Sequence, residues 1–209
     1  MKKRLLLIRH AESEGNKQHI VQGWLDLPLS ERGHEQAELL GRWLAAHFEI
    51  AKIFTSPLCR ATETANYLSK ALNKPLIYHE TLKERNLGAL AGLNREQIKT
   101  QFPNVDMAWL NNLPRPHIEG AENNAEFATR AEQALTNILN ETESETTVAV
   151  FTHGGLLNRL LQNFLTPANG KHISFVFNNA SLSIVDVYSE SIKLVLLNST
   201  THLGKITHA

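Results

Sequence analysis

Short apolar runs alternate with amphipathic stretches along most of the chain. The apolar runs predict short strands at residues 5–8, 53–55, 76–78 and 147–151. The segments between them predict helices at residues 30–48, 60–72, 121–143 and 154–165. Ser30 is a suitable cap for the first of these helices. Residues 182–188 and 192–197 have the pattern of a closing hairpin.

Strands that alternate with helices predict an α/β fold. We expect a mainly parallel central sheet covered on both faces, which is a three-layer α/β/α sandwich. The length of 209 residues suits one domain, residues 1–209, better than two. Residues 102–120 contain proline and lack clear periodicity, so we expect a lid or substrate loop there. The polar tail, residues 199–209, is expected to be disordered.

Composition and charge exclude several classes of partner. Lysine plus arginine equals aspartate plus glutamate, at 21 each, so a broad surface for nucleic acid or anionic membrane is not expected. A single cysteine, Cys59, rules out an intrachain disulfide and indicates a reducing compartment. The apolar run at residues 5–8 is shorter than the roughly 7–15 residues of a secretion signal, and no run approaches the roughly 20 of a membrane span. We therefore expect a soluble cytoplasmic protein.

Three of the predicted strands end in residues that can bind and transfer a phosphoryl group. The first ends in Arg9 and His10, the second leads through a Ser-Pro turn to Arg60, and a later one ends in His153, Gly154 and Gly155. The carboxyl ends of parallel strands meet at one edge of a sheet, where ligands bind. The sequence therefore gathers two arginines and two histidines at the expected binding edge.

The chemistry of this set suits a phosphate ester. Arginine offers a planar, always charged fork for the phosphoryl oxygens, so Arg9 and Arg60 would clamp the group. One neutral imidazole can attack phosphorus, and a second, protonated imidazole can donate to the oxygens. Backbone amides at the Gly154 helix start favour an anion. The leaving oxygen needs a proton from a carboxylic acid kept neutral beside the site, for which Glu84 and Glu12 are candidates.

Four segments resemble the motifs of the histidine phosphatase superfamily, also called the phosphoglycerate mutase-like family. The similarity runs nearly the whole length of the chain. Its segments are LLIRHAESEGNKQHIVQGWLDLPLSERGHEQAELLGRWL (residues 6–44), TSPLCRATETA (55–65), LKERNLGALAG (82–92) and FTHGGLL (151–157). The resemblance implies a phosphoglycerate mutase-like fold, a small phosphorylated metabolite as substrate, and chemistry without a metal or other cofactor.

The resemblance also implies a role for individual residues. His10 would be the phosphorylated nucleophile, and Glu84 the general acid that later activates water. Arg9, Arg60 and His153 would complete the phosphate pocket, with Asn16 and Gly154 as secondary contacts. Gln22 and Gly23 fall near the expected pocket rim, and Glu122 matches the family's glutamate before its long helix. The chain departs from the family pattern at three positions, which are Ala11 for glycine, Ala91 for glutamate and Asn123 for serine.

The same resemblance leaves phosphatase and mutase as alternatives. Arg95 matches a basic substrate-binding position of the mutases, which favours a mutase. Against this, Leu87 replaces the mutase tyrosine, Leu110 and Asn111 replace its paired arginines, and the longer mutase insertion is missing. We therefore favour a phosphatase, with the mutase second and an inactive binding protein third. The sequence leaves the oligomeric state open.

Overall fold

The computed structural model describes residues 1–110, 116–164 and 173–206, and within them the chain forms a six-stranded sheet. Its strands, in the order β3-β2-β4-β1-β5-β6, are Leu76–Tyr78 (β3), Ile50–Thr55 (β2), Thr147–Thr152 (β4), Lys3–Arg9 (β1), Leu182–Val187 (β5) and Ile192–Ser199 (β6). The first four are parallel neighbours, whereas β5 and β6 are antiparallel. The mainly parallel sheet and the closing hairpin are therefore confirmed.

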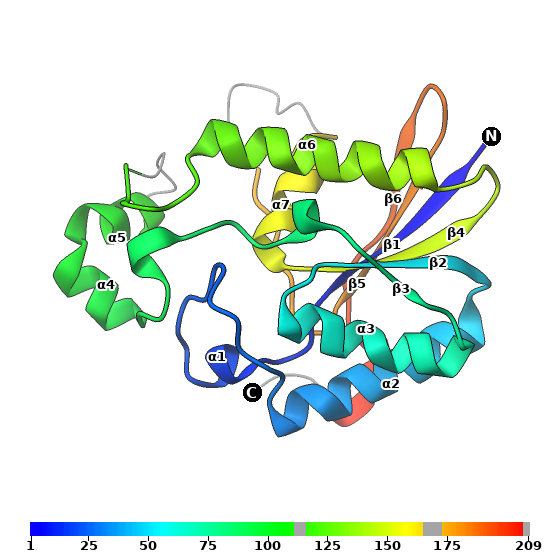
Figure 1. The fold of residues 1–209 in the computed structure, drawn as a ribbon, viewed down its shortest axis with the longest axis horizontal. Coiled ribbons are helices and arrows are strands. Elements are labelled where there is room, and N and C mark those ends of the chain that lie inside the picture. The colour runs from blue at the N-terminus through cyan, green and yellow to red at the C-terminus, as the bar shows by residue number, and fades with distance from the viewer. Residues whose placement is uncertain (111–115, 165–172, 207–209) are drawn as a thin grey trace.

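Helices cover both faces of this sheet (Figure 1). One face carries α2 (Glu31–His47) and α3 (Cys59–Leu72), and the other carries α6 (Asn124–Glu141) and α7 (Gly154–Gln162). Alternate side chains of β1 serve the two layers. Leu6 and Ile8 pack in the cluster that includes α2 and α3, and Leu5 and Leu7 pack in the one that includes α6 and α7. The predicted three-layer sandwich is confirmed.

Residues 103–110 of the segment expected to form a lid are helical, so the prediction of a loop was wrong there. Helix α4 (Arg95–Gln101) begins at a capping box between Asn94 and Gln97, and α5 (Pro103–Leu110) follows directly. Pro103, which suggested a loop, lies at the first position of α5, where a proline is tolerated. Ile98 of α4 is fully buried in a small separate core, so these helices are anchored. Residues 111–115 lie outside the described part.

Smaller differences concern the ends of elements. The short helix α1 (Glu14–Lys17) was not predicted, and α6 begins at Asn124, capped by Asn123, rather than at residue 121. Helix α7 ends at Gln162, and residue 165 lies outside the described ranges. The tail was expected to be disordered, but a 3₁₀ segment, Thr201–Ile206, buries Leu203. Two further 3₁₀ turns are Glu80–Leu82 and Gly88–Leu90.

The carboxyl ends of β1, β2 and β4 lie level with one another. Arg9 at the end of β1 pairs with Thr152 of β4, and Thr55 at the end of β2 pairs with Phe151. The next residue in each strand is therefore delivered to the same edge. Those residues are His10, Ser56 and His153. None of the helices in the described ranges is long and apolar enough to cross a membrane.

Candidate active site

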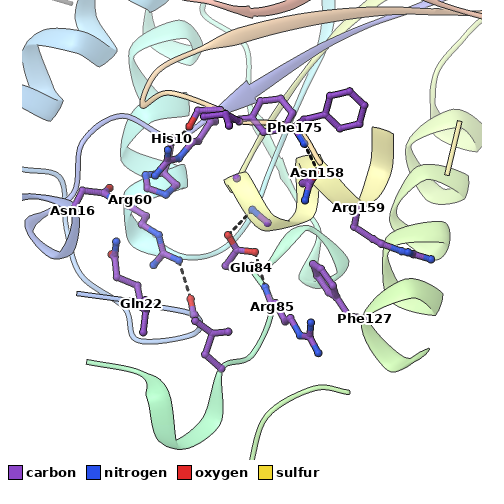
Figure 2. Close-up of a pocket in the computed structure, with 18 of the residues that line it drawn as sticks. His10, Asn16, Gln22, Arg60, Glu84, Arg85, Phe127, Asn158, Arg159 and Phe175 are labelled. Atoms are coloured by element: carbon purple, nitrogen blue, oxygen red, sulfur yellow. Dashed lines mark hydrogen bonds between the residues drawn. The ribbon is translucent and has the colours of Figure 1, made fainter. Parts of the chain in front are cut away.

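A cavity of about 740 Å³ opens at this edge of the sheet. Figure 2 shows it between the end of β1, the start of α3, the segment around Glu84, and helices α6 and α7. Eight of the ten predicted site residues line it, and they are Arg9, His10, Asn16, Gln22, Gly23, Arg60, Glu84 and Gly154. His153 lies behind the lining, with its ring centroid 5.2 Å from that of His10. Arg95 is not in the lining.

The geometry of His10 leaves one ring nitrogen available for attack. Its Nδ1 lies 2.7 Å from the carbonyl oxygen of Ala11, which can only accept a hydrogen bond. In the neutral ring Nδ1 therefore carries the hydrogen, and Nε2 keeps its lone pair. Burial lowers the pKa of His10 well below its usual value, and the charges of Arg60 and Arg9 lower it further. His10 is thus a neutral, oriented imidazole, as a nucleophile requires.

His153 is held by a serine that follows β2. Its Nε2 lies 2.8 Å from Oγ of Ser56, and this oxygen also accepts the backbone N–H of Leu58 at 3.3 Å. Burial lowers the pKa of His153 well below its usual value, and the charge of Arg60 adds to this. The expectation of a protonated second imidazole is therefore not met in this structure. Protonation of His153 requires the negative charge of a bound phosphate group to offset burial and the arginines.

Two arginines, the buried Arg60 and the partly buried Arg9, face the same region. The Nη atoms of Arg60 donate to the carbonyl oxygens of Gly23 (2.8 Å) and Leu25 (3.0 Å), and Arg9 donates to that of Phe177. Burial lowers the pKa of Arg60 to about 10, which still leaves it charged at neutral pH. Among the described residues, Nε of each arginine and Nδ1 of His153 are buried without a hydrogen-bond partner. Such a group of unpaired buried donors is suited to an anion.

The loop after β1 supplies polar side chains to the cavity. Ser13 caps α1 in a capping box with Asn16, whose Oδ1 also accepts from Asn179 at 3.1 Å. Oε1 of Gln22 accepts the hydroxyl of Ser13 at 2.9 Å, so the amide group of Gln22 remains for a ligand. This capping box uses asparagine where glutamate or glutamine is usual, so the sequence pattern did not predict α1.

Glu84 is fixed by two backbone amides. Its Oε2 accepts the N–H of Gly155 at 2.9 Å, and its Oε1 accepts the N–H of Arg85 at 2.8 Å (Figure 2). A side chain at position 155 would collide with this carboxylate, so Gly155 is required here. The sequence predicted that the amides of Gly154 and Gly155 favour an anion, and the N–H of Gly155 instead binds the carboxylate of Glu84. The alternative acid, Glu12, does not line the cavity, because it accepts the hydroxyl of Ser30 at 2.6 Å instead.

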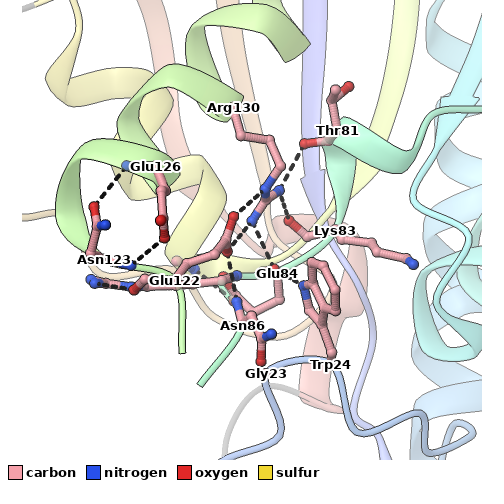
Figure 3. A network of polar contacts seen from close by, with 12 residues as sticks. Gly23, Trp24, Thr81, Lys83, Glu84, Asn86, Glu122, Asn123, Glu126 and Arg130 are labelled. Carbon is pink, nitrogen blue, oxygen red and sulfur yellow. Dashed lines mark hydrogen bonds and ion pairs between the residues drawn. The ribbon is translucent and has the colours of Figure 1, made fainter. Parts of the chain in front are cut away.

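A network of charged side chains holds the backbone of Glu84 from behind (Figure 3). Arg130 makes a two-pronged ion pair with Glu122, with both N–O distances at 2.7 Å. The same guanidinium donates to the carbonyl oxygens of Thr81, Lys83 and Glu84. Trp24 adds a second donor to the carbonyl of Glu84, at 2.6 Å. The candidate acid is therefore positioned through its main chain as well as its carboxylate.

The sequence also singled out Arg95, Ala11 and Leu87. Nε of Arg95 lies 3.6 Å from Asp106, outside the cavity, because α4 directs the side chain to α5. Ala11 has no positive φ, and its N–H donates to Thr64, so the replacement of glycine causes no strain. Leu87 lines the cavity, while Asn111 lies outside the described residues.

Across residues 1–110, 116–164 and 173–206, no group of three or more histidine, cysteine, aspartate or glutamate residues is placed to hold a metal ion. The expectation of chemistry without a metal or other cofactor stays a prediction.

Comparisons with known proteins agree with this geometry. Phosphoserine phosphatase 1 of Hydrogenobacter thermophilus is 31% identical over 203 residues, covering 97% of this chain and 95% of that protein. The solved structure of Bacillus stearothermophilus YhfR matches with a TM-score of 0.85 at 28% identity, covering 96% and 99% of the two chains. A 2,3-bisphosphoglycerate-dependent phosphoglycerate mutase of Bartonella quintana is 39% identical over 108 residues, which are 49% of this chain and 52% of the mutase. The sequence profile of the histidine phosphatase superfamily (branch 1) matches residues 5–200, and the chain belongs to that family.

Proposed function

We propose that this protein hydrolyses small phosphate monoesters through a phosphohistidine on His10. The observation that carries the proposal is the arrangement around His10. Its ring is neutral and fixed through Nδ1, and it lies among the unpaired buried donors of Arg9, Arg60 and His153. These donors match the charged oxygens of a phosphoryl group, and Nε2 remains to attack phosphorus.

The first step transfers the phosphoryl group to the protein. Nε2 of His10 forms a bond to phosphorus while the bond to the leaving oxygen breaks. Arg9 and Arg60 neutralise the charge on the non-bridging oxygens, and His153 donates to one of them. Glu84 acts as the general acid, and a proton on its carboxyl group passes to the leaving oxygen, which departs as an alcohol.

The second step returns the enzyme to its starting state. Glu84, now a carboxylate, takes a proton from a water molecule, whose oxygen attacks phosphorus. The bond between phosphorus and Nε2 breaks, and inorganic phosphate leaves. The two amides on Glu84, from Gly155 and Arg85, keep the carboxylate in one place for both steps.

The structure weakens the main sequence argument for a mutase. Arg95 was the residue that favoured a mutase, and it lies against Asp106 rather than at the cavity. Leu87, where the mutase pattern has tyrosine, contributes an apolar wall. The relative named phosphoserine phosphatase 1 matches over nearly its whole length. Mutase activity remains the second candidate, since a curated mutase matches half of the chain at 39% identity.

The test compares the purified protein with His10→Ala on p-nitrophenyl phosphate, with and without EDTA. We expect EDTA-resistant hydrolysis that is lost in His10→Ala and retained in His47→Ala, an exposed histidine on α2. Acid-labile labelling of the wild-type protein, absent in His10→Ala, identifies the phosphohistidine. Conversion of 3-phosphoglycerate to 2-phosphoglycerate, faster than hydrolysis, would make the protein a mutase. A folded protein with neither activity would support the inactive binding protein.

We further propose that residues 1–209 form one domain, in line with the family match over residues 5–200. We also propose that the enzyme acts in the cytoplasm on a small phosphorylated metabolite. The single cysteine and the balanced charge of 21 basic and 21 acidic residues support this location and argue against a polyanionic partner.

A further inference from the structure

The turn that leads into β5 lies behind the nucleophile. The carbonyl oxygen of His10 accepts the backbone N–H of Ala180 at 3.1 Å and the side-chain amide of Asn179 at 3.3 Å. The other end of the same peptide group, the N–H of Ala11, donates to Thr64 at 3.0 Å. The next carbonyl oxygen, that of Ala11, is the one that holds the ring of His10 through Nδ1. The turn therefore helps to fix the main chain that orients the nucleophile.

This turn is itself held in one conformation. Ala180 is fully buried and has a φ of 54°, in the left-handed region that residues other than glycine rarely adopt. Its carbonyl oxygen accepts a hydrogen bond from Nε2 of His202 at 2.9 Å. The backbone N–H of Asn178 donates to Oδ1 of Asn198 at 2.7 Å. These contacts tie the turn to β6 and to the C-terminal 3₁₀ segment, so Asn179 is presented from a fixed support.

Asn179 also determines which way the amide group of Asn16 faces. Asn16 lies beside His10 in the lining of the cavity (Figure 2). Its Oδ1 accepts the side-chain amide of Asn179 at 3.1 Å and the backbone N–H of Ser13 at 3.1 Å. Because both neighbours are donors, the oxygen of the Asn16 amide is held on their side and its nitrogen is left for the cavity. Within the described ranges, Nδ2 of Asn16 donates to no other residue.

We infer that Asn179 is a positioning residue for phosphoryl transfer. It presents the N–H groups of Asn16 to the phosphate group, and it supports the main chain of His10. This rests on the proposed function, in which Asn16 contacts the phosphoryl group. Asn179 is not in the cavity lining, so it acts through these two residues. The carbonyl oxygen of His10 only accepts, so the amide nitrogen of Asn179 faces this side, and its two hydrogens serve the two acceptors.

Two aspartate variants of equal charge test this inference. Asn179→Asp keeps the shape of the side chain but has no hydrogen to donate, and it places carboxylate oxygens against two acceptors. We expect kcat/KM for p-nitrophenyl phosphate to fall about a hundredfold in Asn179→Asp and about tenfold in Asn179→Ala. Asn178→Asp adds the same charge one residue away, and the side chain of Asn178 bonds to no described residue, so its loss should be much smaller. Equal losses in the two aspartate variants, both shown to be folded by thermal unfolding, would overturn the inference.

A second measurement separates positioning from a general effect on structure. Calorimetric titration with inorganic phosphate should show about tenfold weaker binding in Asn179→Ala than in the wild-type protein. In the Asn16→Ala background the same change should have little further effect, because the group through which Asn179 acts on phosphate is gone. Additive losses would show that Asn179 acts on the structure in general and would overturn its role.

The titration needs no turnover, so it also distinguishes failure of this inference from failure of the proposed function. A wild-type protein that binds phosphate but hydrolyses no ester would contradict the phosphatase. Loss of binding in Asn179→Ala but not in Asn178→Ala would then still support the role of Asn179. Ester hydrolysis that depends on His10 but is unchanged in Asn179→Asp would leave the phosphatase standing and overturn the inference. A wild-type protein that binds no phosphate would overturn both.

Discussion

The backbone N–H of Gly155 donates a 2.9 Å hydrogen bond to Oε2 of Glu84. This bond joins two segments that lie 71 residues apart in the sequence, the first turn of α7 and the irregular segment after β3. The residue just before the α7 start, His153, lies beside the nucleophile. One strand–helix junction therefore sets the distance between the proposed phosphate-binding histidine and the proposed general acid.

Gly155→Ala should reduce catalysis by displacing Glu84. An added Cβ would overlap the Glu84 carboxylate, and the misplaced acid should lower kcat by about a hundredfold or more, with a much smaller change in KM. Steady-state kinetics on p-nitrophenyl phosphate measures both. Gly154→Ala is the matched comparison, since its Cβ would meet Arg9 at 3.5 Å, an ordinary contact, and its loss should be smaller. Equal losses in the two variants would contradict the stated role of Gly155.

Ser56→Ala should destabilise the protein and impair phosphoryl transfer. It removes the hydrogen-bond partner of His153 Nε2, which is completely buried. An unpaired buried nitrogen costs about 1–3 kcal/mol, which urea unfolding can measure. The ring of His153 also loses the contact that fixes its tautomer, so kcat should fall by about tenfold. Unchanged stability together with unchanged kcat would show that Ser56 does not position His153.

Stability should fall as the pH drops below about 6.5. The pKa values of His10 and His153 are lowered well below 6.5 in the folded protein, mainly by burial. Between the folded value and 6.5 the unfolded chain binds protons that the folded chain does not, so stability decreases as pH falls through this window. Each histidine should cost about 1.4 kcal/mol between about pH 7.5 and about pH 5.5. Urea unfolding at both pH values should show a shallower dependence in His153→Gln, and an identical slope would contradict this assignment.

Arg130→Met should be more damaging than removal of the whole ion pair. The single change removes the ion-pair partner of Glu122, a largely buried carboxylate with 14% of its side chain exposed, and leaves it only the N–H of Asn86 and the nearby charge of Arg85, so it should cost about 3 kcal/mol. Arg130→Met combined with Glu122→Leu should recover part of this stability, measured by urea unfolding. Both proteins should remain poor catalysts, because the carbonyl of Glu84 has lost one of its two donors. Full recovery of kcat in the double variant would show that Arg130 does not position the acid.

The sequence predicted that Arg9, His10 and His153 lie together, because the strands that precede them set their positions. Arg9, His10 and His153 directly follow or end apolar runs, and parallel pairing with level carboxyl ends brings such residues together. The position of each residue is thus set by its immediate neighbours. The same reasoning located Arg60 at the start of a helix and Glu84 through its motif.

The side of the cavity away from His10 depends on how the helices are oriented, and the local sequence pattern does not determine that orientation. Arg95 matched a motif position, yet α4 turns it to Asp106, whereas Arg159 had no motif and lines the cavity. The helix at residues 103–110 was missed because Pro103 and weak periodicity suggested a loop. The capping box at Asn94 was a usable signal for α4, and the i, i+4 spacing of Gly155 and Arg159 was one for the side of the cavity that α7 lines.

The guanidinium groups of Arg9 and Arg60 are held by backbone carbonyls, so they remain in place after the ester bond has been broken. Inorganic phosphate formed in the second step meets the same donors as the ester did. We therefore expect free phosphate to compete with the ester for these donors. The same backbone-held arginines would serve both to capture the substrate and to bind the product.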